Sequence, residues 1–248
     1  MKGTGAYGER VSTTLSTTIE LAGREVRRVG LGTNRLTHTP ANVEFIRAAV
    51  EAGLQHIDTA HLYTGGESEA TIGEALSPQP DGVVVATKGG FGGAGRGRPE
   101  VLRAQIDESL RRLRTDVIDL YYLHRVDPET PLEESLGTIK EAVDAGKIRA
   151  AGVSAVTVEQ IERARRVLPI AAVQNQYNPG AREHDPVVDY CEREGIVFVP
   201  YYPLRSGGAP AESLAWLLSR SPAILPIPGT LSLAHLKENL AALSPGAR

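Results

Sequence analysis

The feature that most constrains the fold is a regular alternation of two patterns along almost the whole chain. Short runs rich in β-branched residues alternate with longer segments in which apolar residues recur at helical spacing. This alternation predicts parallel strands joined by crossover helices, with a repeat of about 25 to 35 residues, the length of one strand–helix unit. The predicted strands cover residues 28–32, 56–60, 83–88, 117–124, 148–154, 171–177, 197–204 and 223–228.

Eight such units predict an α/β fold of the (β/α)8 TIM-barrel class. The chain has 248 residues, and a barrel of this kind needs roughly 250. No linker divides the sequence, so we expect one barrel domain over residues 1–248. Ahead of the first barrel strand, Ala22-Gly23-Arg24 lies between two short runs. This arrangement predicts an N-terminal β-hairpin over residues 18–28 that closes the lower end of the barrel.

The residues at the ends of the predicted helices agree with this pattern. Thr39 and Asp185 each stand before a proline, which predicts a capping oxygen followed by proline at the first helical position. Gly53, Gly146 and Gly195 follow helical segments, where a left-handed residue is favoured. The sequence therefore predicts where several helices begin and end.

Charge and cysteine content narrow the partners and the location. Twenty-seven basic and thirty acidic residues are interspersed and give a net charge of -3, so we expect neither nucleic acid nor a membrane surface as partner. No apolar run approaches the ~18 residues that a membrane span needs. The single cysteine, Cys191, cannot form an intramolecular disulfide, which fits a reducing cytoplasm. The sequence leaves the oligomeric state open.

Four reactive side chains stand at or just after the carboxyl ends of the second, third and fourth predicted strands: Asp58, Tyr63, Lys88 and His124. Active sites of these barrels form at that end of the strands, so we expect the four to meet. Taken singly, each has a plain structural explanation such as capping or packing, but together they favour a catalytic site. The chain has five lysines against twenty-two arginines. This scarcity favours a chemical role for Lys88, because the pKa of a lysine can be tuned.

The four residue types predict proton transfer to a carbonyl oxygen. A phenol with its usual pKa near ~10 is a weak acid at neutral pH. We expect the Lys88 ammonium to lower the pKa of Tyr63 by stabilising its phenolate, while Asp58 holds Lys88 charged. Tyr63 then acts as the general acid and His124 donates a hydrogen bond to the same oxygen. This scheme needs neither a metal nor a covalent intermediate.

The motifs around these residues resemble those of the aldo-keto reductase family over residues 30–239. The resemblance implies that the four side chains are a catalytic tetrad and that the chain reduces a small aldehyde or ketone with NADPH. The matching pieces are Gly30-Leu31-Gly32-Thr33, Ile57-Asp58-Thr59-Ala60 with Tyr63 after it, Thr87-Lys88 and Asp119-Leu120-Tyr121-Tyr122-Leu123-His124.

The same resemblance implies a site for NADPH or NADP+ along the later strands. Ser154 and Gln174 match residues that hydrogen-bond the nicotinamide carboxamide, and Tyr201 matches an aromatic residue that stacks on the ring. The segment 227–230 and residues of the helix after it match the part that binds the 2′-phosphate and adenine. The expected cofactor residues are Gly32, Thr33, Ser154, Gln174, Tyr201, Pro203, Leu204, Ser206, Ile227, Gly229, Thr230, His235, Glu238 and Asn239.

Departures from the family pattern leave details open. Ala155 stands where many relatives have an amide that also contacts the carboxamide. The segment ending at Gly229 lacks a lysine that some relatives direct at the 2′-phosphate, and His235 stands where they often have arginine. NADH therefore stays an alternative cofactor. The glycine-rich stretch 89–97 fits both a lid over the barrel mouth and a plain flexible connection.

Two other functions fit parts of the sequence. A lysine at a barrel strand end can form an imine, as in a Schiff-base lyase that uses Lys88, but Asp58 argues against this because a nearby carboxylate favours the charged ammonium. The chain also fits a non-catalytic NADP-binding sensor or subunit with the same fold, which the presence of all four reactive residues opposes. The fold alone does not separate these functions.

Overall fold

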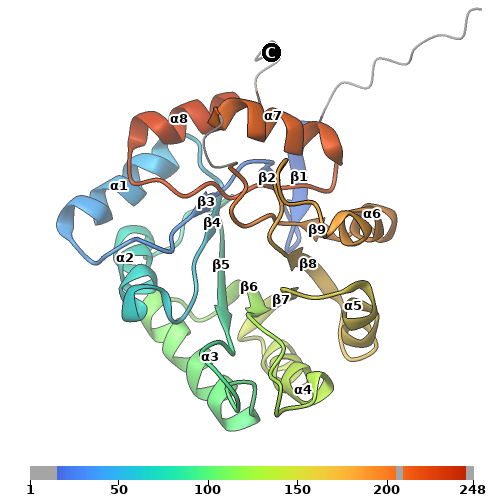
Figure 1. Ribbon diagram of the computed structural model, residues 1–248. Coiled ribbons are helices and arrows are strands. Elements are labelled where there is room, and N and C mark those ends of the chain that lie inside the picture. The colour runs from blue at the N-terminus through green and yellow to red at the C-terminus, as the bar shows by residue number, and fades with distance from the viewer. Residues whose placement is uncertain (1–15, 205–208, 244–248) are drawn as a thin grey trace, which may run out of the picture.

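The computed structural model describes residues 16–204 and 209–243 and shows the predicted (β/α)8 arrangement, with helices around the outside of a curled parallel sheet (Figure 1). Neighbouring strands pair in chain order: β3 (Leu31–Gly32), β4 (His56–Asp58), β5 (Val84–Gly89), β6 (Ile118–Leu123), β7 (Ile148–Ser154), β8 (Ile170–Gln174) and β9 (Val197–Phe198). The helices are α1 (Pro40–Glu51), α2 (Glu67–Leu76), α3 (Pro99–Leu113), α4 (Leu132–Asp144), α5 (Val158–Arg165), α6 (Asp185–Glu194), α7 (Pro210–Arg220) and α8 (Leu233–Ala241).

The eighth predicted strand, 223–228, closes the sheet but does not form a continuous ladder. On one side, the Leu225 N–H donates to the Phe198 carbonyl of β9; on the other, the Pro226 carbonyl accepts from the Gly30 N–H just before β3. Pro226 and Pro228 have no N–H to donate in return, so regular pairing is interrupted. The predicted continuous strand is therefore wrong in detail, while its place between β9 and β3 is right.

The predicted hairpin forms from β1 (Thr18–Leu21) and β2 (Arg24–Arg27), which pair antiparallel across a two-residue turn. Both turn residues, Ala22 and Gly23, have positive φ, as a tight turn between twisted strands requires. The hairpin's apolar residues pack with residues from inside the barrel, among them the buried Val84 and Val197 at the starts of their strands. The hairpin thus closes the amino end of the barrel, opposite the mouth.

The predicted helix ends are confirmed except at one position. Thr39 caps α1 by accepting from the Asn42 N–H. Gly53, Gly146 and Gly195 all have positive φ after helices. Asp185 is not the cap of α6: it is the first helical residue, and its carboxylate accepts from the Tyr177 hydroxyl and the Arg182 guanidinium instead.

We predict that Leu21→Ala lowers the free energy of unfolding by about 2 to 5 kcal/mol, because Leu21 is 1% exposed and its removal leaves a cavity under the barrel. Urea denaturation measures the loss, and Ile19→Ala, on the half-buried part of the same strand, should cost clearly less. A loss below about 1 kcal/mol for Leu21→Ala would show that the hairpin does not unfold together with the barrel.

Candidate active site

The carboxyl ends of three neighbouring strands bring the four predicted reactive side chains to one mouth of the barrel. Asp58 ends β4, and Tyr63 begins the short 3-10 turn η1 (Tyr63–Gly66) that follows it. Lys88 lies near the end of β5, and His124 directly follows β6, where its N–H donates to the Gly89 carbonyl. The parallel register of β4 with β5 and of β5 with β6 holds these positions side by side.

The Lys88 ammonium is fully buried and makes three hydrogen bonds. It donates to Asp58 Oδ1 at 2.5 Å, to the Thr59 carbonyl at 2.7 Å and to the Tyr63 hydroxyl at 3.4 Å. Burial alone would lower the pKa of Lys88, but Asp58 and then Tyr63 outweigh it and raise the pKa above its ordinary value. An ammonium has three N–H donors. Lys88 is therefore held charged, with every proton occupied.

Tyr63 differs from the sequence expectation in the direction of its pKa. Burial raises the pKa of the phenol above its ordinary value, and the neighbouring Lys88 ammonium offsets only part of that effect. The expected lowering of the Tyr63 pKa is thus wrong for the protein without cofactor. The phenol therefore keeps its proton at neutral pH.

His124 is held neutral by its surroundings. Burial first, and then the charges of Lys88 and Arg125, lower the pKa of His124 to about 2. The imidazole meets the Tyr63 ring edge-on, with centroids 5.9 Å apart, and lies 4.8 Å from the Phe91 ring. Its Nδ1 has no hydrogen-bond partner within the described residues. A neutral imidazole keeps one N–H, so His124 can donate a hydrogen bond without carrying charge.

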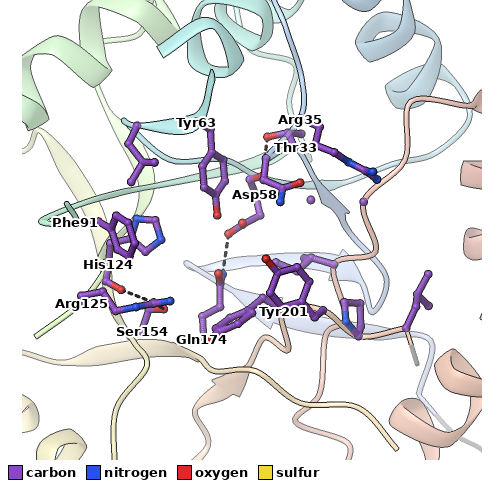
Figure 2. Close-up of a pocket in the computed structure, with 18 residues that line it drawn as sticks. Thr33, Arg35, Asp58, Tyr63, Phe91, His124, Arg125, Ser154, Gln174 and Tyr201 are labelled. Atoms are coloured by element: carbon purple, nitrogen blue, oxygen red, sulfur yellow. Dashed lines mark hydrogen bonds between the residues drawn. The ribbon is translucent and has the colours of Figure 1, made fainter. Parts of the chain in front are cut away.

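A cavity of about 650 Å³ opens at this mouth, and most of the predicted site residues line it (Figure 2). Lys88 is an exception, since it lies behind Asp58 and Tyr63 and does not line the cavity. The predicted residues that line it are Gly32, Thr33, Asp58, Tyr63, His124, Ser154, Gln174, Tyr201, Pro203, Leu204, Ile227 and Gly229.

The residues predicted to bind the far end of the cofactor lie outside this cavity. Thr230 follows Gly229, and its hydroxyl accepts from the Ser232 N–H at the start of α8. His235 and Glu238 are exposed on α8, whereas Asn239 is buried beneath it. Ser206 lies outside the described residues. Among the described residues, the structure therefore brings together the part of the site nearest the reactive groups and leaves Thr230, His235, Glu238 and Asn239 before or on α8.

The chemistry of the cavity wall suits a nicotinamide ring. Tyr201 presents a half-buried aromatic face. Ser154 is buried at the end of β7, and its hydroxyl accepts from Arg125 while no described residue accepts its own proton. Gln174 ends β8 and donates to the second Asp58 oxygen at 2.8 Å. A flat aromatic wall beside hydroxyl and amide groups is what a planar ring with a carboxamide requires.

Several cavity residues escaped the sequence reasoning. Leu62, Phe91, Arg125 and Tyr202 line the cavity, as do Asn34 and Arg35. Arg125 had a usable signal, because it directly follows a strand-end histidine. Phe91 had a weaker one, as the only aromatic residue in the glycine-rich stretch.

The glycine-rich stretch forms part of the cavity wall. Asp127 holds it, since its carboxylate accepts from the Gly95 N–H at 3.0 Å and from the Gly97 N–H at 2.6 Å. Burial raises the pKa of Asp127, but these bonds and others from backbone N–H groups outweigh that effect and lower the pKa to about 2. The anchor therefore stays ionised, and the loop carries Phe91 against His124.

Other predicted features lie away from the cavity. Cys191 is buried in α6, and burial raises the pKa of its thiol to about 12, which fits an unreactive cysteine. Among residues 16–204 and 209–243, no three His, Cys, Asp or Glu side chains are grouped so as to hold a metal ion. No helix in the same residues is long and apolar enough to span a membrane.

Known proteins share both the sequence and the fold. The model of the aldo/keto reductase family matches residues 28–213. Pyridoxine 4-dehydrogenase of Escherichia coli is 34% identical over 271 residues, covering 92% of this chain and 93% of that protein. The thermostable aldo-keto reductase Tm1743, solved with the inhibitor epalrestat, is 32% identical with a TM-score of 0.83 over 92% of this chain and 94% of that one.

A further solved structure is that of an aldo/keto reductase from Klebsiella pneumoniae in complex with NADP and acetate. It is 28% identical, with a TM-score of 0.81 over 92% of this chain and 90% of that one. The likeness thus extends over most of the chain and over its fold. This chain belongs to the aldo/keto reductase family of oxidoreductases.

Proposed function

We propose that this protein reduces a small aldehyde or ketone to the alcohol in the cytoplasm, with NADPH as the hydride donor and Tyr63 as the general acid. One observation carries the proposal: the Tyr63 hydroxyl lies on the cavity and accepts a hydrogen bond from a buried ammonium that Asp58 keeps charged. Family membership supports the reaction class. A small carbonyl compound is the partner that fits a cavity of this size.

The residues around the cavity support the proposed cofactor site. Tyr201 offers a stacking surface, while Ser154 and Gln174 offer hydrogen-bonding groups to a carboxamide. When bound there, NADPH supplies a hydride to the carbonyl carbon. Gly229 and Thr230 lead from the cavity to the start of α8, where backbone N–H groups favour a phosphate. The residues from the reactive groups to the start of α8 would thus hold the cofactor.

Two side chains of the protein then stabilise the negative charge that develops on the substrate oxygen. Tyr63 donates its proton to that oxygen, and neutral His124 donates a hydrogen bond to it. The phenolate left on Tyr63 lies beside the Lys88 ammonium. The ammonium stabilises this negative oxygen more strongly than it stabilises the neutral phenol, because Lys88 is fully buried and its charge is screened little by water. Lys88 therefore lowers the barrier without contacting the substrate.

The Schiff-base alternative is not favoured by this arrangement. An imine needs an unprotonated amine that reaches the substrate. Lys88 is held charged, donates all three protons to protein oxygens and does not line the cavity. A sensor that binds NADP without turnover is distinguished by the first experiment below.

Tyr63→Phe should lower kcat for NADPH-dependent reduction of a test aldehyde by roughly 10²- to 10⁴-fold, the usual contribution of a general acid. NADPH affinity should stay within a few-fold, because the ring is kept. Tyr190→Phe is the matched control, since its hydroxyl bonds Arg165 on the outer face. If Tyr63→Phe kept full turnover, Tyr63 would not be the acid. If the unaltered protein bound NADPH but reduced no aldehyde tried, it would be a sensor.

The pH profile of reduction tests the ionisation states. The phenol must keep its proton, and its pKa is raised, so activity is present below that pKa and lost only above it. The imidazole must be neutral, and its pKa is lowered to about 2, so activity is present above that value. We expect kcat/KM to be level from about pH 5 to 9. A limb with an apparent pKa near ~6.5 would mean that His124 titrates as an ordinary histidine.

Cofactor preference is checked by calorimetric titration of the protein with NADPH and with NADH. We expect NADPH to bind at least roughly tenfold more tightly, because hydrogen bonds to its charged 2′-phosphate near Thr230 and α8 add to the shared contacts. Equal dissociation constants would make NADH the equivalent donor and remove the phosphate role of this segment. Repeating the titration at high salt should reduce the difference between the NADPH and NADH dissociation constants, because salt screens the phosphate charge.

A further inference from the structure

Arg125 lies at one end of the cavity, and the reaction proposed above uses it only through its charge, which helps to lower the pKa of His124. It directly follows His124 and lines the same cavity. Its Nη1 donates to the His124 carbonyl at 2.8 Å and to the Ser154 hydroxyl at 3.2 Å. Its guanidinium lies 5.3 Å from the centre of the Phe91 ring and 5.6 Å from that of Tyr201. Figure 2 shows it beside His124 and Phe91, with Arg35 at the opposite end.

The guanidinium has no counter-ion in the part of the chain that the structure describes. No carboxylate in residues 16–204 and 209–243 forms an ion pair with Arg125, and its two bonds to protein oxygens both use Nη1. Its Nε and Nη2 carry three further N–H donors that no described residue accepts. Asp58, the one carboxylate among the described residues that line the cavity, is already paired with Lys88. A half-buried cation with unused donors on a cavity wall can bind an anionic group of a ligand.

The position of Arg125 places it near the reacting oxygen. That oxygen must lie within hydrogen-bond reach of Tyr63 and His124, and Phe91 contacts both the His124 ring and the Arg125 guanidinium. The two aromatic rings hold the guanidinium on the cavity side. Its planar fork matches a carboxylate with two parallel hydrogen bonds.

The cavity also has large apolar and aromatic side chains in its wall. Leu62, Phe91 and Tyr202 line it and are exposed by 39%, 41% and 64% of their surface. Large apolar side chains left uncovered around a concave site favour an apolar ligand body. The wall therefore fits a compound that combines an apolar frame with one negative group.

We propose that Arg125 determines specificity by pairing with a carboxylate on the carbonyl substrate, so that the preferred substrates are small, largely apolar aldehydes or ketones that bear a carboxylate. The inference rests on the proposed reductase function. Arg125 acts in binding and takes no part in proton transfer. Its loss should therefore appear in KM for carboxylate substrates more than in kcat.

The experiment compares 4-carboxybenzaldehyde with its uncharged methyl ester, each reduced with NADPH. Arg125→Met should lower kcat/KM for the carboxylate roughly tenfold to a hundredfold, the effect of a lost charged hydrogen-bonded pair. The ester should change less than about threefold, because both proteins keep the same reactive groups. Arg166→Met, an exposed arginine outside the cavity, is the matched control and should alter neither substrate.

A calorimetric titration with benzoate and with benzamide, in the presence of NADP+, reports the pairing without turnover. Benzoate should bind the unaltered protein and should bind the Arg125→Met variant more weakly. Benzamide should bind both proteins with the same affinity. If no aldehyde is reduced but benzoate binding still depends on Arg125, the reductase function fails and the carboxylate site stands. Equal losses for both aldehydes, or a change confined to the NADPH dissociation constant, would overturn the proposal and make Arg125 a cofactor residue.

Discussion

The buried ion pair between Lys88 and Asp58 is the constraint on which the mouth of the barrel depends. An uncompensated charge at this depth would cost about 3 to 5 kcal/mol, so the ammonium must keep its partners. Those partners come from β4, from the Thr59 carbonyl after it and from the turn that carries Tyr63. Gln174 of β8 holds the other Asp58 oxygen from across the barrel. Through these bonds, Lys88 and Asp58 link the strands and the turn that form the site.

The same burial sets the protonation states of the two side chains that we propose act on the substrate. Burial raises the pKa of Tyr63 and lowers that of His124, so the phenol keeps its proton and the imidazole is neutral. Both are then hydrogen-bond donors at neutral pH, which is the state that carbonyl reduction requires. Lys88 adds charge only where the phenolate forms. A single physical cause, desolvation, therefore prepares the acid and the second donor together.

The sequence predicted the parts of the molecule in which local pattern and tertiary packing agree. Strand–helix alternation gave the barrel, and the strand ends gave Asp58, Lys88 and His124, because parallel strands all finish at one edge. The missing N–H groups of Pro226 and Pro228, which interrupt the closing ladder, could have been read from the sequence. Prediction failed for a long-range reason at Tyr63, whose pKa follows the depth of burial. Neither burial nor the inter-strand partner of a residue can be read from its neighbours in the chain.

The residues of the proposed reaction are held by strands, whereas residues that shape the substrate pocket lie on loops. Asp58 and Lys88 are fixed by sheet register and His124 by its N–H bond to Gly89. Phe91 comes from a loop that Asp127 anchors through backbone N–H groups, and such a loop accepts sequence changes without disturbing the barrel. Arg125 lies one residue beyond the rigid histidine. Changes in these outer side chains can therefore alter which carbonyl compound fits, while the buried ammonium and its partners keep the chemistry unchanged.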